Sequence, residues 1–196
     1  MTSHSPSPLL LVLNAGSSSL KFGVFEARGG ACVARGLVER IGAANAELTL
    51  TDTGDHSTRQ VPILAPTHAE CVGPVLDEII KITGDRLAAV GHRLVYGGER
   101  ASAPAKVDPA LIEELRRASP LAPEHLPAEI EIIEAVTCQF PNLPQVACFD
   151  TTFHHHLPRV ARMLPIPRRY EARGIRRHGY HGLSFEFLME ELRRLH

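Results

Sequence analysis

Between two apolar segments lies a run of small and hydroxyl residues that ends in a lysine, NAGSSSLK at 14–21. Small residues let backbone N–H groups approach an anion closely, and the hydroxyls and lysine add donors suited to a phosphate. The run differs from a P-loop of the GxxxxGK[ST] type, because its lysine follows the serines and a strand rather than a helix is expected next. A plain hairpin turn with surface serines explains the same composition equally well.

A second candidate lies in GHRLVYGGE at 91–99, where an apolar segment carries Arg93 close to its end and glycines follow. Ends of strands are where open α/β sheets bind ligands. An arginine there can hold a carboxylate or phosphate through two parallel hydrogen bonds, which a lysine cannot do. Pairing of Arg93 with a neighbouring acid such as Glu99 is the alternative explanation.

Two further segments place polar residues at the ends of expected elements. FDTTFH at 149–154 puts Asp150 directly after an apolar run, and GYHGLS at 179–184 puts His181 just before an expected helix. A histidine near a helix N-terminus is well placed to meet an anion. A carboxylate that caps a turn and a surface histidine are the corresponding alternatives. The run His154–His156 is a poor metal site if it is extended, because adjacent side chains then point to opposite sides.

The elements that must position these residues follow from periodicity and from capping signals. Thr67 and Glu70 form a capping box, and Asp108-Pro109 combines an N-cap with proline at the first helical position. Strands are predicted at 9–13, 20–25, 32–38, 87–95 and 145–149, with weaker candidates at 47–50 and 58–63. Helices are predicted from 67, at 108–118, at 127–138, and along an apolar stripe between 185 and 195. The first three strands are expected to form an antiparallel meander at one side of a layered α/β domain.

Bulk composition excludes several classes of function. The chain has 196 residues and a net charge of -1, so no overall field attracts nucleic acid or a membrane surface, and a small mobile substrate is favoured. Its four cysteines include no CxxC pair, which argues for a reducing cytoplasm rather than a disulfide framework. No apolar stretch approaches the roughly 20 residues of a membrane span. Residues 1–8 are expected to form a disordered tail.

The segments NAGSSSLKF, GHRLVYGGE, LAPEHLP, FDTTFH and GYHGLS resemble, in this order, the signature blocks of the acetate kinase family. That family belongs to the acetate and sugar kinase, Hsp70 and actin superfamily. The resemblance implies one ribonuclease-H-like α/β domain over residues 9–196, with a mixed five-stranded sheet that opens with the meander and is flanked by helices. In the full-length enzyme this domain is duplicated, the active site lies in the cleft between the copies, and a homodimer is expected.

The resemblance also implies the reaction, a reversible in-line transfer of the γ-phosphoryl group of ATP to acetate that gives acetyl phosphate and ADP. In such a transfer the protein supplies position and positive charge. By this resemblance, Asn14 would bind Mg²⁺ (or Mn²⁺), and the ATP phosphates would be bound by Gly16, Ser17, Ser19 and Lys21. The substrate would be bound by Arg93, Val95, His125 and Tyr180. The catalytic residues would be Asp150, Arg93 and His181, of which His181 would stabilise the transition state. Acetate is already ionised near about pH 7. We therefore expect Asp150 to orient Arg93 or a magnesium-bound water.

Two departures from the family pattern limit these expectations. Glu124 and Leu126 stand where leucine and asparagine are usual, and a charge in the pocket wall leaves the acyl preference open to propionate or butyrate. The family's enzymes are also about twice as long, and their second half carries the adenosine site, a further arginine and a magnesium glutamate. The isolated chain is therefore expected to be inactive as a kinase. A non-catalytic anion-binding or assembly domain is the remaining alternative.

Overall fold

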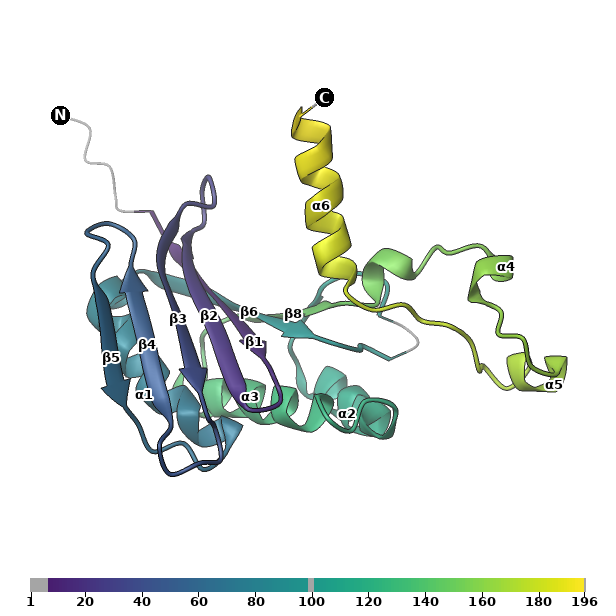
Figure 1. Cartoon of the computed structure of the whole chain (residues 1–196), viewed down its shortest axis with the longest axis horizontal. Coiled ribbons are helices and arrows are strands. Elements are labelled where there is room, and N and C mark those ends of the chain that lie inside the picture. The colour runs from purple at the N-terminus through teal and green to yellow at the C-terminus, as the bar shows by residue number, and fades with distance from the viewer. Residues whose placement is uncertain (1–6, 99–100, 196) are drawn as a thin grey trace.

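The computed structural model describes residues 7–98 and 101–195. Its centre is an eight-stranded mixed sheet with the order β5-β4-β3-β2-β1-β6-β8-β7, drawn in Figure 1. The strands are β1 (Leu9–Ala15), β2 (Ser19–Glu26), β3 (Cys32–Glu39), β4 (Glu47–Asp52), β5 (Thr58–Pro62), β6 (Leu87–Leu94), β7 (Ala105–Lys106) and β8 (Gln145–Phe149). Most of the expected tail and the candidate partner Glu99 lie outside the described residues.

The antiparallel half of the sheet follows the alternation in the sequence. In β1 the side chains of Leu9, Leu11 and Leu13 are buried, whereas Val12 between them is 40% exposed. The expected meander β1–β2–β3 is confirmed, with Asn14 opposite Lys21 in the first pair. The sheet is wider than the five strands expected, because the weak candidates β4 and β5 pair along their length and the two-residue β7 is too short to leave a periodic signal.

The parallel half of the sheet sets the position of the candidate residues. Strands β1, β6 and β8 run parallel to one another, with β6 in the middle. Their carboxyl ends therefore meet at one edge of the sheet, at Ala15, Leu94 and Phe149. The predicted mixed α/β architecture is thereby confirmed, and the candidate residues Asn14, Arg93 and Asp150 lie at these strand ends.

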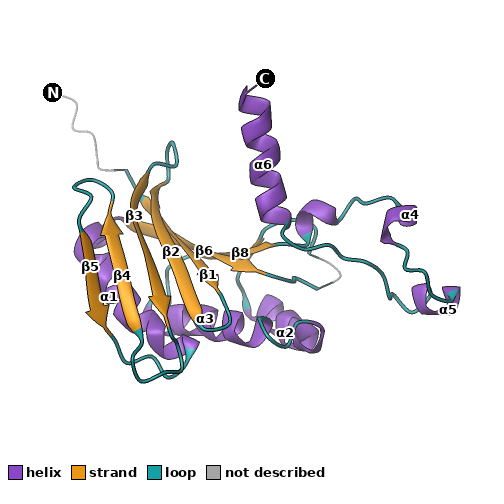
Figure 2. Ribbon diagram, in the orientation of Figure 1, coloured by secondary structure: helices purple, strands orange, loops and turns teal. Residues whose placement is uncertain are grey.

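One face of the sheet is covered by α1 (His68–Thr83), α2 (Pro109–Ala118) and α3 (Leu126–Gln139), which Figure 2 shows beneath it. The predicted caps are present: the Thr67 hydroxyl accepts from the Glu70 N–H, and Asp108 accepts from the Leu111 N–H at 2.8 Å. Buried leucine, isoleucine and valine side chains from these helices and from the strands form the core. The 3₁₀ turns η1 (Gly84–Arg86) and η2 (Ser119–Leu121) follow α1 and α2.

Beyond β8 the chain leaves the sheet. It forms the 3₁₀ turn η3 (Thr152–His154), the short helices α4 (Arg159–Arg162) and α5 (Arg168–Glu171) on a long excursion, and α6 (Gly182–Leu195), which stands clear of the sheet. The run His154–His156 is not extended, in contrast to the expectation. The N–H of His155 instead closes a turn by donating to the Thr152 carbonyl at 2.9 Å.

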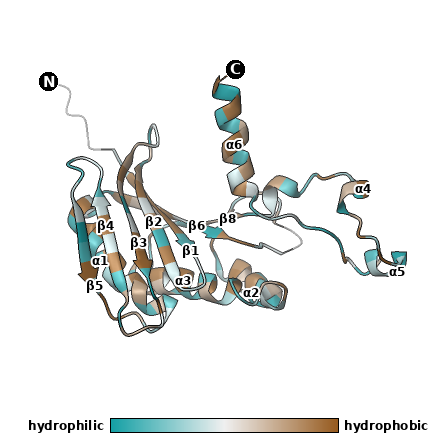
Figure 3. Cartoon of the chain, in the orientation of Figure 1, coloured by the Kyte–Doolittle hydropathy of each residue, from teal (hydrophilic) through white to brown (hydrophobic). Residues whose placement is uncertain are grey.

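The predicted terminal helix is present, but its apolar stripe is not buried within the described residues. Figure 3 shows hydrophobic residues alternating with polar ones along α6, away from the core. Beyond the half-buried Leu183 in its first turn, its large apolar side chains are each at least 42% exposed: Phe185, Phe187, Leu188, Met189, Leu192 and Leu195. Within residues 7–98 and 101–195, no helix has the length and apolar character needed to cross a bilayer.

Candidate active site

Four side chains form a row across the sheet at the edge where the parallel strands end. Lys21 on β2 lies opposite Asn14 on β1, Asn14 opposite Arg93 on β6, and Arg93 opposite Cys148 on β8. Residues directly opposite one another project from the same face of a sheet. Because neighbouring strands are about 4.8 Å apart, the backbones of Lys21 and Arg93 are separated by roughly 10 Å. This face is opposite to the one that α1 and α3 cover.

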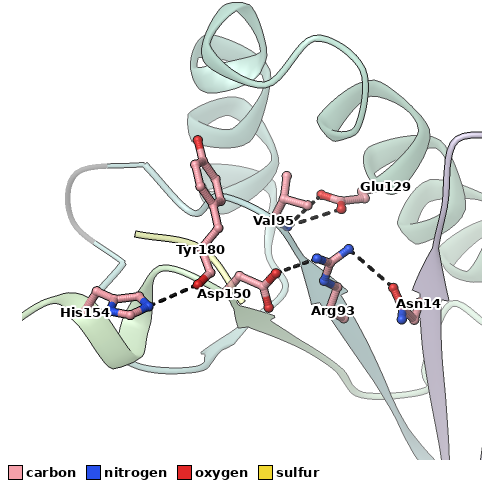
Figure 4. Close-up of polar contacts among 7 residues, drawn as sticks. All are labelled: Asn14, Arg93, Val95, Glu129, Asp150, His154 and Tyr180. Atoms are coloured by element: carbon pink, nitrogen blue, oxygen red, sulfur yellow. Dashed lines mark hydrogen bonds and ion pairs between the residues drawn. The ribbon is translucent and has the colours of Figure 1, made fainter. Parts of the chain in front are cut away.

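The guanidinium of Arg93 connects the first and last of the parallel strands. Its Nη2 donates to Asp150 Oδ2 at 2.5 Å, and its Nη1 lies 3.4 Å from Asn14 Oδ1, as Figure 4 shows. The Asp150 side chain is 4% exposed and that of Arg93 is 22% exposed. The acid that pairs with Arg93 is thus Asp150, which lies next to it in space, while Glu99 is outside the described residues. Two residues that the sequence placed separately at strand ends form one ion pair.

Asp150 is fixed by its backbone as well as by its charge. Its N–H donates to the Leu94 carbonyl at 2.9 Å, and its carbonyl accepts the N–H of Gly182 at 2.8 Å. The second bond ties the first residue of α6 to the end of β8. Glycine is required there, because a Cβ on Gly182 would lie 2.1 Å from the Asp150 carbonyl oxygen.

His181 stands at this junction, immediately before α6. Its carbonyl accepts the first helical hydrogen bond, from the Phe185 N–H at 3.1 Å. Its backbone has a φ of 58°, a left-handed conformation that is uncommon for residues with a side chain. The preceding turn is held by His154, whose Nε2 donates to the Tyr180 carbonyl at 3.0 Å. The backbone of His181 is therefore fixed at the junction of β8 with α6 in a strained conformation, and its side chain is exposed.

Two adjoining cavities open on this cluster, and both are lined by Arg93, Asp150 and His181. The first, of about 450 Å³, is closed on its other sides by the η2–α3 loop and by the residues before α6. The second, of about 600 Å³, extends past Asn14 toward α6. The first cavity contains the other residues expected around the substrate together with Glu124: Val95, His125 and Tyr180.

The residues expected at the ATP phosphates lie elsewhere. Gly16, Ser17, Ser19 and Lys21 line neither of the two cavities. The segment forms a hairpin turn in which the Gly16 N–H donates to the Ser19 carbonyl at 2.8 Å, and the Gly16 carbonyl accepts from His68 Nε2 at 2.8 Å. The hairpin alternative is thus correct as a description of the backbone. Of the residues expected at the ATP phosphates and the cation, Lys21 and Asn14 lie in the row of Arg93.

One charged residue of this region was missed by the sequence reasoning. Glu129, in the first turn of α3, is 3% exposed, and both of its carboxylate oxygens accept from the Val95 N–H, at 3.2 and 3.3 Å. Burial raises the pKa of Glu129 to about 7, although the Val95 N–H and the Arg93 charge oppose the rise. The signal was an acidic residue on the apolar face of α3, three positions from Leu126 and one before Ile130.

Comparison with known proteins agrees with this fold. The sequence profile of the acetokinase family matches residues 9–195. The acetate kinase of Deinococcus radiodurans is 44% identical over 181 residues, which are 91% of this chain and 45% of that protein. The crystal structure of Porphyromonas gingivalis acetate kinase superposes with a TM-score of 0.84 at 33% identity, covering 91% of this chain and 46% of that one. A propionate kinase from Francisella tularensis superposes with a TM-score of 0.88 at 30% identity, covering 96% of this chain and 49% of that one.

Proposed function

The chain belongs to the acetokinase family, and from this premise we propose that it forms the carboxylate-binding wall of an enzyme that transfers the γ-phosphoryl group of ATP to acetate. The observation that carries the proposal is the shared lining of the two cavities by Arg93, Asp150 and His181. A carboxylate in one cavity and a phosphoryl group in the other would meet at these three side chains.

Arg93 is proposed to bind the carboxylate. Two of its nitrogens face Asp150 and Asn14, which leaves further N–H donors of the guanidinium for a ligand. Val95, His125 and Tyr180 line the same cavity and would surround the acyl group. Because Asp150 is ion-paired with Arg93, its proposed role is to orient the guanidinium rather than to exchange a proton.

His181 is proposed to stabilise the transferring phosphoryl group. In-line transfer spreads negative charge over the equatorial phosphoryl oxygens, and a donor held at the N-terminal end of a helix is well placed to meet it. His181 directly precedes α6 and lines both cavities. The backbone bonds on either side of His181, from Gly182 to Asp150 and from Phe185 to His181, support a fixed position of its backbone at this junction.

The nucleotide and its cation would lie along the same face. Lys21 and Asn14 follow Arg93 in the row across the sheet, so we place the ATP phosphates there, with Gly16, Ser17 and Ser19 at the adjoining turn. The amide oxygen of Asn14 is a ligand type that Mg²⁺ and Mn²⁺ accept, and Mg²⁺ commonly takes only one or two protein oxygens beside substrate phosphates. A bound Mg²⁺ would neutralise phosphate charge; the residues of this chain would orient both substrates.

The chain spans about half the length of the curated relative described above. We propose that residues 9–195 form one wall of a cleft, as an N-terminal domain with a ribonuclease-H-like fold, and that the other wall and the homodimer contacts are supplied by sequence of the kind found in the relatives' other half. Loss of a single preorganised donor can lower kcat about 10²- to 10³-fold. Residues 1–196 alone are therefore expected to be essentially inactive.

A second candidate activity, phosphorylation of propionate, is favoured by one observation. The first cavity is large for acetate, and the propionate kinase structure superposes as well as the acetate kinase. Glu124 at its wall replaces an apolar residue of the family pattern. A panel of acetate, propionate and butyrate separates these acyl preferences.

Titration of the ¹⁵N-labelled chain with sodium acetate, followed by NMR, tests the proposed site. Resonances of Val95, Tyr180 and His181 should shift together, and the shifts should disappear in Arg93→Gln but persist in Arg35→Gln, a matched change on the exposed part of β3. A separate hydroxamate assay with ATP, Mg²⁺ and acetate should detect almost no acetyl phosphate. Acetate shifts confined to other residues would contradict the site, and rapid acetyl phosphate formation would contradict the one-wall proposal.

A further inference from the structure

Glu129 lies behind the first cavity rather than in it. It comes from the first turn of α3, and its carboxylate accepts the backbone N–H of Val95 with both oxygens. Val95 lines the cavity, whereas Glu129 does not. Figure 4 shows the carboxylate beside the Val95 backbone, with Arg93 two residues earlier, on β6. The side chain would therefore affect a bound ligand through the Val95 backbone and through its charge, rather than by direct contact.

Burial at the position of Glu129 is energetically unfavourable for an ionised carboxylate. The side chain is almost completely buried among apolar residues of α3 and β6, and its neighbours Leu126 and Ile130 belong to the core. A buried carboxylate is destabilised relative to its protonated form unless partners compensate. Its pKa is accordingly raised to about 7, with burial as the main cause.

We propose that Glu129 is a positioning residue, and that protonation of its buried carboxyl group is coupled to the binding of a carboxylate at Arg93. The carboxyl group holds the Val95 backbone, which forms part of the cavity wall. When the carboxyl group is ionised, its negative charge weakens the attraction of an anionic ligand to Arg93. This inference rests on the proposed binding of a carboxylate at Arg93.

The charges around Arg93 explain the direction of the coupling. Arg93 carries one positive charge and Asp150 one negative charge, so ionised Glu129 leaves the cluster with a net negative charge, which opposes an incoming anion. A carboxylate bound at Arg93 adds a further negative charge near Glu129 and raises its pKa. Binding therefore takes up a proton, and linkage requires the affinity to fall as the pH rises through about 7.

Histidines near the cavity could produce a pH dependence of the same sign, so the test must separate them from Glu129. His181 and His125 line the cavity, and His125 immediately precedes α3 as its N-cap residue. Glu129→Gln removes the charge but keeps an oxygen that can accept the Val95 N–H. Glu131→Gln, on the exposed side of the same helix, is the matched control.

The experiment uses the ¹⁵N-labelled chain, with sodium acetate as the probe, between about pH 6 and about pH 8. In the wild type and in E131Q, the Val95 amide resonance should titrate near neutral pH, and the acetate Kd should rise several-fold, to at most about tenfold, over this range. In E129Q the Val95 titration should disappear, and acetate should bind at the higher pH as tightly as the wild type does at the lower.

Two results would overturn the proposal: a Val95 amide that does not titrate in the wild type, or an acetate Kd in E129Q that keeps the full pH dependence. The Val95 titration needs no ligand and no variant, so its absence from the wild type overturns the proposal even if E129Q folds poorly. Failure of acetate to bind at any pH would instead contradict carboxylate binding at Arg93, and with it the proposed function, while a Val95 titration that E129Q abolishes would still support the positioning role.

Discussion

Arg93 and Asp150 are 57 residues apart in the chain, yet Nη2 of one lies 2.5 Å from Oδ2 of the other. The pair exists because β6 and β8 are parallel neighbours and both side chains stand where those strands end. The two partners are buried to different degrees, since Asp150 is almost inaccessible whereas Arg93 keeps a fifth of its surface in contact with solvent.

This difference predicts unequal effects of removing each partner. Arg93→Ala leaves a buried carboxylate unpaired and should lower the free energy of unfolding by about 3–5 kcal/mol. Asp150→Ala leaves a cation that can reach water and should cost at least about 1 kcal/mol less. Urea unfolding of both variants near neutral pH measures the two losses. Equal losses would show that burial does not determine the energetics of this pair.

A methyl group added at Gly182 should disturb the junction of β8 with α6. Its Cβ would lie 2.1 Å from the Asp150 carbonyl oxygen and 2.8 Å from Phe153 Cβ. We expect Gly182→Ala to cost about 1–3 kcal/mol through overpacking and to shift the His181 resonances. Gly73→Ala is the matched control, because Gly73 lies within α1 and a Cβ there meets nothing within 4 Å. Because Gly73 precedes Pro74, whose ring disfavours helical backbone in a preceding residue with a Cβ, that variant should change the free energy of unfolding by less than about 1 kcal/mol.

His92, one residue before Arg93, should contribute to acid denaturation. It is buried, its Nε2 donates to Gln145 Oε1 at 2.7 Å, and burial lowers its pKa to about 4. The unfolded chain then binds more protons than the folded chain between about pH 6.5 and about pH 4, so stability falls as the pH falls through this window, by up to about 3 kcal/mol.

His92→Gln should flatten the acid side of the stability curve, even if its stability at neutral pH is lower. Circular dichroism of urea unfolding at a series of pH values measures the slope. His56→Gln, at an exposed turn, should leave the slope as in the wild type. A variant H92Q whose stability decreases as steeply with acid as the wild type would assign the effect to other groups.

Glu129 should make the protein less stable as the pH rises, whereas His92 makes it less stable as the pH falls. Because its pKa is raised from 4.5 to about 7, the folded chain binds more protons than the unfolded chain between these values, and stability falls as the pH rises through them. Glu129→Gln should therefore be more stable than the wild type above about pH 7, by on the order of 1–3 kcal/mol, and no more stable below about pH 4.5. Thermal unfolding at the two extremes measures the difference, and equal shifts at both would contradict it.

The sequence predicted the strands and helices that have clear local signals. The alternation in β1, the capping box at Thr67 and the proline after Asp108 depend on neighbouring residues, so they could be read without the fold. Strand β7 could not, because two residues have no period and pair only where β8 offers an edge.

The candidate site was predictable residue by residue but not in its pairing. Residue types at strand ends indicated Arg93 and Asp150 separately, whereas their contact depends on the order of strands in the sheet. Glu129 was missed because a charged residue on an apolar helix face is recognisable only when the face is known to be buried. The left-handed backbone of His181 likewise arises from the junction with β8, which no local pattern encodes.

The attachment of α6 at its first turn has a mechanical consequence. The helix is held by the hydrogen bond from Gly182 to Asp150 and by the stacking of Phe185 on Phe153, and its 14 residues extend for about 20 Å beyond that point. A tilt of about 10° about this fulcrum would swing Leu195 by about 4 Å but would displace His181 by less than about 1 Å. Because α6 is attached at its first turn, a displacement at Leu195 is reduced several-fold by the time it reaches His181.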